Sequence, residues 1–224
     1  MTNNQRVRLF NKTLIAATVC GSLFAGTLSA GSIVGSAHDF SNRGWINPFG
    51  EICVFCHTPH NADTTVIGAP LWNHELTTAT YTLYDSPTFD GAATIIQPGG
   101  VSILCLSCHD GTVAIDSYGT NPGTTFISGA ALIGTDLSND HPISFDYTTA
   151  LALDDGSLHD PMSTTVTIGE GDKTKVGTIA EVMLFADQLQ CASCHDVHNT
   201  FTADDPLLRI TNVGSALCLT CHNK

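Results

Sequence analysis

The sequence predicts a fold with little regular secondary structure, in which short helices and short β-hairpins surround bound groups instead of a conventional apolar core. Two observations predict this fold. The five-residue pattern Cys-x-x-Cys-His occurs four times, starting at Cys53, Cys105, Cys191 and Cys218. The chain between the copies is rich in Gly, Thr and Asn, which favour loops. Such long loops need another packing partner in a compact domain.

The repeated pattern is the attachment signature of c-type haem. Two thiols form thioethers with the porphyrin, and the adjacent histidine becomes the proximal iron ligand. Zinc sites and disulfide frameworks also use paired cysteines, but neither needs the histidine that follows every pair here. The sequence therefore predicts four covalently bound haems. The predicted attachment residues are Cys53, Cys56, Cys105, Cys108, Cys191, Cys194, Cys218 and Cys221, with proximal ligands His57, His109, His195 and His222.

Residues 1–30 have the pattern of an export signal. A basic start is followed by a largely apolar stretch from Thr13 to Gly26 and by a small-residue cleavage site at Leu28-Ser29-Ala30. The apolar stretch is short and is interrupted by glycine, so we expect no membrane-spanning helix. Cys20 lies inside the signal and has no expected role after cleavage. We expect a secreted protein whose mature chain begins at Gly31.

The mature chain is strongly acidic. Residues 1–30 contain three of the eight basic side chains and no acidic ones, which leaves five basic against 21 acidic residues and a formal net charge of −16. This balance excludes nucleic acid as a natural partner, because that binding depends on neutralising phosphates with lysine and arginine. It favours cationic partners or metal ions.

Residues 31–224 are predicted to form one tetrahaem domain, because each half holds too little apolar chain to fold alone. The uneven spacing of the motifs indicates a repeated site without a repeated structural unit. Four apolar or β-branched segments predict short strands, with a hairpin turn at residues 169–172: Tyr81–Tyr84, Thr94–Ile96, Thr164–Ile168 and Val176–Phe185. Helical turns are expected at Val101–Cys108 and Ser215–Cys221, and a long loop at Ser117–Ser128.

The second axial ligand of each iron decides between electron transfer and chemistry on a substrate. The mature chain has only two methionines, Met162 and Met183, but six histidines outside the motifs. His60 and His198 each stand three residues after a proximal ligand. Side chains at this spacing lie on one side of the backbone and cannot reach opposite faces of one iron. Each must therefore bind a haem other than the one attached beside it.

The other four histidines are harder to rank from the residues alone. His141 and His159 both lie beside an aspartate and close to a proline, and the residues do not separate them. His74, close to Trp72, is favoured as a hydrogen-bonding histidine, since histidine is commonly part-buried. His38 lies near the start of the mature chain, and a histidine in a terminal arm is usually solvated.

Taken with their flanks, the motifs resemble those of tetrahaem extracellular cytochromes that polymerise into conductive filaments, the outer-membrane cytochrome E type in particular. The similarity extends over nearly all of the mature chain outside Asn121–Thr135 and Leu151–Ala186. The segments that carry it are Gly35–Phe40, Cys53–Asn61, Ala69–His74, Leu104–Ser117, Asp140–Phe145, Cys191–Asn199 and Ala216–His222.

The resemblance implies a ligand set and an assembly. It implies that the distal ligands are His38, His60, His141 and His198, that the haems stack in succession, and that the His38 arm reaches a haem of a neighbouring subunit. We therefore expect a non-enzymatic electron carrier in an extracellular filament that serves extracellular respiration, with other multihaem cytochromes or extracellular acceptors as partners. Two alternatives are a monomeric periplasmic shuttle, which would satisfy all ligands within one chain, and a multihaem reductase, which would leave one iron five-coordinate.

Overall fold

A computed structural model describes residues 32–43, 50–66, 68–202 and 207–223. The predicted export signal, including Cys20, lies outside the described residues. In the described part the longest helix has 10 residues and the longest strands have four, so the prediction of little regular secondary structure is confirmed.

The helices are α1 (Gly100–His109), α2 (Thr149–Asp155), α3 (Ile179–Val182), α4 (Cys191–Cys194) and α5 (Ala216–Leu219). The strands are β1 (Ser117–Tyr118), β2 (Asn121–Pro122), β3 (Phe145–Asp146), β4 (Thr165–Ile168), β5 (Lys175–Thr178) and β6 (Gln188–Leu189).

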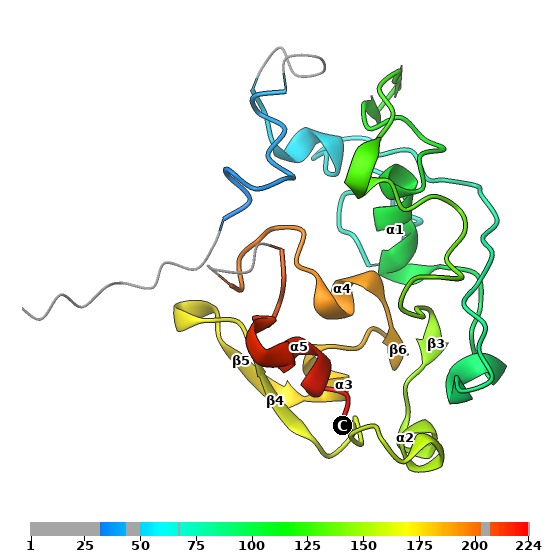
Figure 1. Ribbon diagram of the computed structural model, residues 1–224. Helices are drawn as coiled ribbons and strands as arrows, with labels where there is room; N and C mark the ends of the chain where they lie inside the picture. Colours follow the sequence, from blue (N-terminus) through cyan, green and yellow to red (C-terminus); the bar gives the residue numbers. More distant parts are fainter. Residues whose placement is uncertain (1–31, 44–49, 67, 203–206, 224) are drawn as a thin grey trace, which may run out of the picture.

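The strands form three separate antiparallel ribbons, each of two strands, instead of one sheet (Figure 1). β4 and β5 form the predicted hairpin, with Thr165 opposite Thr178 and Ile168 opposite Lys175. β3 pairs with β6, and β1 pairs with β2 inside the segment predicted as a loop. No helix in the described part of the chain is long and apolar enough to cross a membrane.

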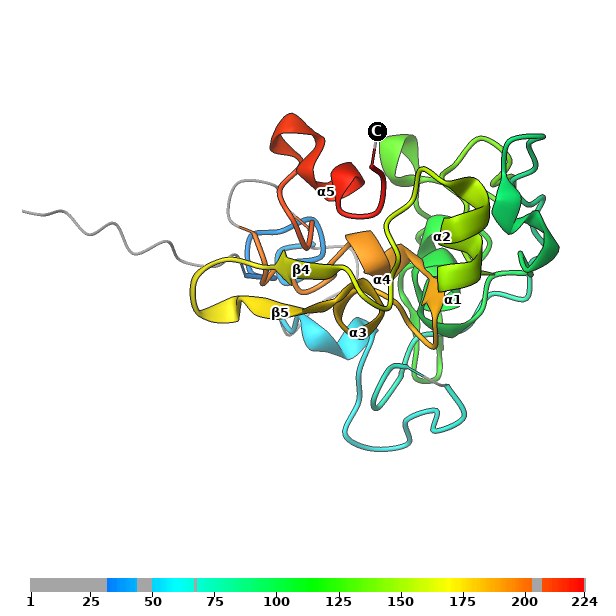
Figure 2. The ribbon, with the colours of Figure 1, turned by 90° about the horizontal axis from the view of Figure 1, so that it is seen from below.

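The buried apolar side chains form two small clusters instead of one core. The larger one packs around Tyr147, Ile168, Ile179 and Met183 in the C-terminal half. The smaller one contains Tyr81, Leu106 and Leu137. Helix α4 lies between α1 and α5 in both views of the chain (Figures 1 and 2), and it contacts α1 directly. Leu106 of α1 belongs to the smaller cluster and Leu217 of α5 packs against the larger one, so helices that carry haem motifs contribute to both clusters.

Two of the predicted strands are wrong. At Tyr81–Tyr84 the backbone is extended, but the side-chain amide of Gln97 takes the place of a partner strand by bonding both the N–H and the C=O of Tyr81, at 2.8 and 2.9 Å. The only bridge in this segment joins Thr82 to Asp136. At Thr94–Ile96 the chain ends a 3₁₀ helix, Asp90–Ala93, whose C-cap is Thr94.

The predicted strand Val176–Phe185 is only half correct, because β5 ends at Thr178 and α3 begins. The Thr178 hydroxyl accepts a hydrogen bond from the Glu181 N–H, and the Glu181 carboxylate accepts one from the Thr178 N–H. This reciprocal cap stabilises a helix start and outweighs the β propensity of the apolar residues that follow. The Thr-x-x-Glu spacing is visible in the sequence and marks this start.

The predicted helices agree with the structure. α1 contains the expected Val101–Cys108, and α5 lies within Ser215–Cys221. Helix α2 was not predicted, although both of its ends have recognisable signals. The Thr148 hydroxyl accepts a hydrogen bond from the Leu151 N–H, and Gly156 ends the helix at φ 69° in the left-handed conformation.

Aspartates that directly follow histidines fix the chain after them. In each of four cases the carboxylate accepts a hydrogen bond from the N–H two residues further on, which closes a local turn. The turns begin at Asp39, Asp110, Asp160 and Asp196. Part of the acidic composition of the chain therefore serves to stabilise these turns.

Asp110 is the most connected of these aspartates. Its carboxylate accepts hydrogen bonds from the hydroxyls of Thr77 and Tyr81, both at 2.6 Å, and from the N–H and hydroxyl of Thr112. Burial of the carboxyl opposes ionisation, but these hydrogen bonds outweigh it and lower the pKa of Asp110. The residue therefore ties the extended segment 77–81 to the end of α1.

We predict that Asp110→Ala lowers the free energy of unfolding by about 1–3 kcal/mol, because it leaves buried donors without an acceptor. Since the folded pKa of Asp110 is depressed, its contribution is present above the unfolded value of about 3.9 and is lost as pH falls through the folded value. Thermal unfolding of the holoprotein measures the effect. The control, Asp136→Ala, removes an exposed carboxylate that caps Ser138 and should change little. Equal stability of the two variants would contradict the role of Asp110.

Candidate haem sites

Each of the four Cys-x-x-Cys-His segments folds as one turn of helix. The histidine N–H donates to the carbonyl of the first cysteine in three of them, at 2.8 Å in His57, 3.1 Å in His195 and 3.0 Å in His222. The second motif lies in the last turn of α1. The spacing i, i+3, i+4 places both thiols and the histidine on one face of such a turn. The turns at the first and third motifs were not predicted, although the same spacing indicates them.

None of the eight motif cysteines forms a disulfide within the described residues. Burial raises the pKa of Cys56 to about 11 and that of Cys108 and Cys221 to about 12. These thiols are protonated and apolar in the polypeptide. A thioether has no proton to lose, so attachment of haem leaves no ionisable group in these positions.

The four motifs lie next to one another in sequence order. The thiols of Cys105 and Cys191 are in hydrogen-bonding contact, and the Cys191 N–H donates to the Ser102 hydroxyl at 2.9 Å. The second and third motifs are therefore back to back on α1 and α4. Cys56 is close enough to Cys108 to raise its pKa, and Cys194 does the same to Cys221. The fold thus brings all four attachment turns into one continuous group.

Three proximal histidines face a second histidine from a distant part of the chain. The ring centroids of His57 and His198 are 6.3 Å apart and nearly parallel, at 15°. The rings of His109 and His38 are 6.1 Å apart, and those of His222 and His141 are 6.4 Å apart. Every distal member of these pairs belongs to the predicted ligand set.

This spacing fits two imidazoles that share one iron. A metal lies about 2.0–2.1 Å from a bound imidazole nitrogen, and that nitrogen lies about 1.1 Å from the ring centroid, so two rings on opposite sides of one metal have centroids about 6.3 Å apart. Ordinary offset or edge-to-face contacts between rings cover about 4.5–7 Å, which includes this spacing. The observed range of 6.1–6.4 Å agrees with coordination geometry. The residues present fit c-type haem.

Backbone carbonyls orient the ligand rings. The Nδ1 atom of His57 donates to the Pro70 carbonyl at 2.8 Å, that of His109 to the Ala131 carbonyl at 2.7 Å, and that of His141 to the Pro142 carbonyl at 2.9 Å. A carbonyl only accepts, so Nδ1 carries the proton and Nε2 keeps its lone pair for a metal. In His198 the Nδ1 atom is 3.9 Å from the carboxylate of Asp196.

The N-terminal arm is folded onto the chain, unlike a solvated terminus. Phe40 packs on the buried Phe55, with ring centroids 4.9 Å apart, and Asn199 donates to the carbonyl of Ser32 at 3.1 Å. Burial, followed by the neighbouring His109 and His198, lowers the pKa of His38 to about 4. Its imidazole is therefore neutral at physiological pH, which is the form that binds a metal.

The remaining histidines occupy different settings. His60 and His195 are exposed, and their rings are not in contact within the described part of the chain. His74 is buried beside Trp72, and its ring nitrogens face the carbonyls of Glu75 and Ala114 at 2.7 and 3.1 Å. A neutral imidazole has one N–H, so only one of these carbonyl contacts is a hydrogen bond. The Nε2 atom also lies 3.4 Å from the Cys108 thiol, which can donate to it. This setting agrees with the hydrogen-bonding role expected for His74.

The contacts of His159 with the fourth motif and with Tyr147 are made by its backbone. Its backbone N–H donates to the Cys221 carbonyl at 2.8 Å, and its carbonyl accepts from the Tyr147 hydroxyl at 2.6 Å. These backbone contacts hold the fourth motif in place. The ring that faces His222 at ligand spacing is that of His141. The structure thus brings His141 together with a proximal histidine, and among the described residues it shows no such contact for the ring of His159.

Two buried polar side-chain atoms have no hydrogen-bond partner among the described residues, namely His38 Nδ1 and Trp72 Nε1. Each ring lies against a proximal histidine, His38 on His109 and Trp72 on His57, the latter at 6.4 Å. Buried polar atoms without partners are rare and indicate a missing water, ion or ligand. Their position at two predicted haem sites is consistent with a bound group there.

Comparison with known families gives one match. Residues 184–224 match the family described as the doubled CXXCH motif, which covers the third and fourth haem motifs. No curated protein matches the chain. The match supports a multihaem c-type cytochrome that works in electron transfer and binds haem covalently. It covers the C-terminal part of the chain, and the first two motifs lie outside it.

We predict that His141→Ala leaves one haem without its sixth ligand, whereas the control His159→Ala leaves every haem six-coordinate. The reason is that only the ring of His141 faces His222 at the spacing of a shared iron. Electronic absorption and electron paramagnetic resonance of the oxidised variants distinguish high-spin from low-spin iron. A high-spin haem in the His159 variant alone would show that His159, and not His141, is the sixth ligand.

Proposed function

We propose that the chain is an exported electron carrier with four bis-histidine c-type haems. The observation that carries this proposal is the set of three histidine pairs at 6.1–6.4 Å, each joining a motif histidine to a predicted distal ligand. For the fourth iron, we propose the remaining two histidines, His195 and His60. His57 and His60 would then serve different haems, as would His195 and His198, in a reciprocal arrangement.

Bound haem supplies an iron that gains or loses one electron. The chain's own residues do the rest. Pairs of cysteines would hold each group covalently, and two histidines would bind each iron, so no coordination position would remain for a substrate. This filling separates the proposed carrier from a reductase. The contact between α1 and α4 keeps successive sites close enough for electrons to pass between them.

We further propose that the carrier works outside the cell and that its subunits join head to tail into a filament through His38. In a single chain, the arm that carries His38 lies against His109 of the same chain. A filament requires this contact to form between subunits instead, with the arm exchanged for that of a neighbour, as in domain swapping. An open, head-to-tail series of such exchanges gives a fibre. The support for the filament is the resemblance of the motifs and their flanks to those of filament-forming cytochromes. The intrachain pair is the observation that supports a second candidate, a monomeric periplasmic shuttle.

We predict four haem additions on a chain that begins near Gly31. The four complete motifs each provide two thiols and a proximal histidine. Intact mass spectrometry of the denatured protein, together with haem staining, counts only covalently attached groups. A fully matured protein with three or fewer haems would contradict the tetrahaem assignment.

We predict that His38→Ala abolishes filaments and leaves one haem without its sixth ligand, while the other three stay low-spin. The matched control is Val34→Ala, an exposed residue on the same arm, which should preserve filaments. Electron microscopy and absorption spectra of the secreted protein measure both effects. Normal filaments of the His38 variant would contradict the exchanged arm, and a wild-type protein that stays monomeric with four low-spin haems would establish the shuttle.

A further inference from the structure

Arg209 is the one shielded cation in the described part of a strongly acidic chain. The other basic side chains there, Arg43, Lys173 and Lys175, are exposed, whereas Arg209 is partly buried. A guanidinium stays protonated in proteins, so Arg209 is a permanent positive charge. Its interactions are screened by water less than those of an exposed charge.

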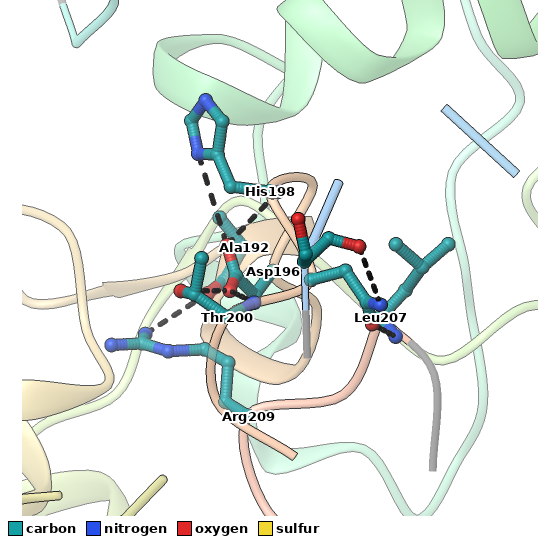
Figure 3. Close-up of polar contacts among 8 residues, drawn as sticks. Ala192, Asp196, His198, Thr200, Leu207 and Arg209 are labelled. Carbon is teal, nitrogen blue, oxygen red and sulfur yellow. Dashed lines mark hydrogen bonds and ion pairs between the residues drawn. The ribbon is translucent and has the colours of Figure 1, made fainter. Parts of the chain in front are cut away.

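Four contacts fix the Arg209 side chain and backbone beside the third haem motif, and Figure 3 shows the one with Ala192. One guanidinium nitrogen donates to the carbonyl of Ala192, inside the motif, at 3.0 Å, and the other donates to the carbonyl of Val182 at 2.5 Å. The guanidinium carbon lies 5.3 Å from the centroid of the Phe201 ring. The backbone N–H of Arg209 donates to the carbonyl of Cys194 at 3.0 Å. The charge is therefore held against the attachment turn itself.

The nearest carboxylate is occupied by its own loop. Asp196 accepts hydrogen bonds from the N–H of His198 at 3.1 Å and from the N–H and hydroxyl of Thr200 at 2.6 and 2.7 Å (Figure 3). No hydrogen bond or ion pair joins it to Arg209 in the described structure. Among the described residues the guanidinium contacts carbonyls and an aromatic ring. Burial lowers the pKa of Arg209, and the Asp196 carboxylate opposes this shift through space, so the positive charge is offset in part but not paired.

We propose that Arg209 raises the reduction potential of the haem attached to Cys191 and Cys194. A positive charge near an iron favours the reduced form, which carries one positive charge less. At an effective dielectric constant of about 20 and a separation of about 10 Å, a unit charge changes a one-electron equilibrium on the order of tenfold, which is about 59 mV. This inference rests on the proposed function, because it requires haem at the third motif.

The test compares three variants of the holoprotein by redox titration of all four haems. Arg209→Gln removes the charge and keeps a hydrogen-bond donor, so one of the four potentials should fall by about 59 mV. Arg209→Lys keeps the charge and should restore most of that potential. Lys175→Gln is the matched control, since its ammonium lies 5.5 Å from the same Phe201 ring but is exposed, and it should leave all four potentials unchanged.

The affected haem is identified by proton contacts between its methyl groups and the methyl group of Ala192 in nuclear magnetic resonance spectra. Unchanged potentials in Arg209→Gln, with four low-spin haems, would overturn the inference. An equal fall in Arg209→Lys and Arg209→Gln would also overturn it, because the residue would then act through its clamp geometry and not through its charge. Failure of the proposed function is separate: it would show as fewer than four haems in the mass of the wild-type protein.

Discussion

The proposed holoprotein depends on pairs of histidines that come from distant parts of the chain. His57 faces His198, His38 faces His109, and His141 faces His222, each at the spacing of one shared metal. Every such pair joins segments that are far apart in sequence. In the proposed holoprotein a metal between the rings would be a cross-link, and binding of this kind stabilises the folded state because the unfolded chain has no preformed site.

This constraint explains how a chain with so little secondary structure holds a defined shape. Its strands form only isolated ribbons, and its apolar residues make two small clusters in place of a single core. Local devices do the remaining work. Carboxylates such as those of Asp110 and Asp196 close turns next to the ligands, and backbone carbonyls hold the imidazole rings. Each device fixes the backbone or ring orientation on which ligand placement depends.

The sequence predicted the local features well. The five-residue spacing of the haem motif is itself helical, and the hairpin around residues 169–172 follows from two β-branched segments separated by glycine-rich chain. Two strand predictions failed because side chains made hydrogen bonds that a strand model does not include. Gln97 bonds both backbone groups of Tyr81, and Thr178 with Glu181 starts a helix inside an apolar run. The second of these was visible in the sequence as a capping pattern, and the first was not.

Partner choice among the histidines could not be derived from the residues. His141 and His159 have similar flanks, and only the fold shows that the ring of His141 faces His222. The folded arm around His38 is a second such case, because its contacts with Phe55 and His109 come from segments distant in sequence. Local patterns predict which residues can bind iron. The long-range fold decides which two of them meet.

The most direct test of this account is electron paramagnetic resonance of the fully oxidised holoprotein. Histidine on both axial positions of every iron predicts low-spin signals that account for all four haems, with no sizeable high-spin component. A stable high-spin haem that binds nitrite or a similar small molecule would contradict the account, because it would mean that one proximal histidine has no partner and that its iron is open to a substrate.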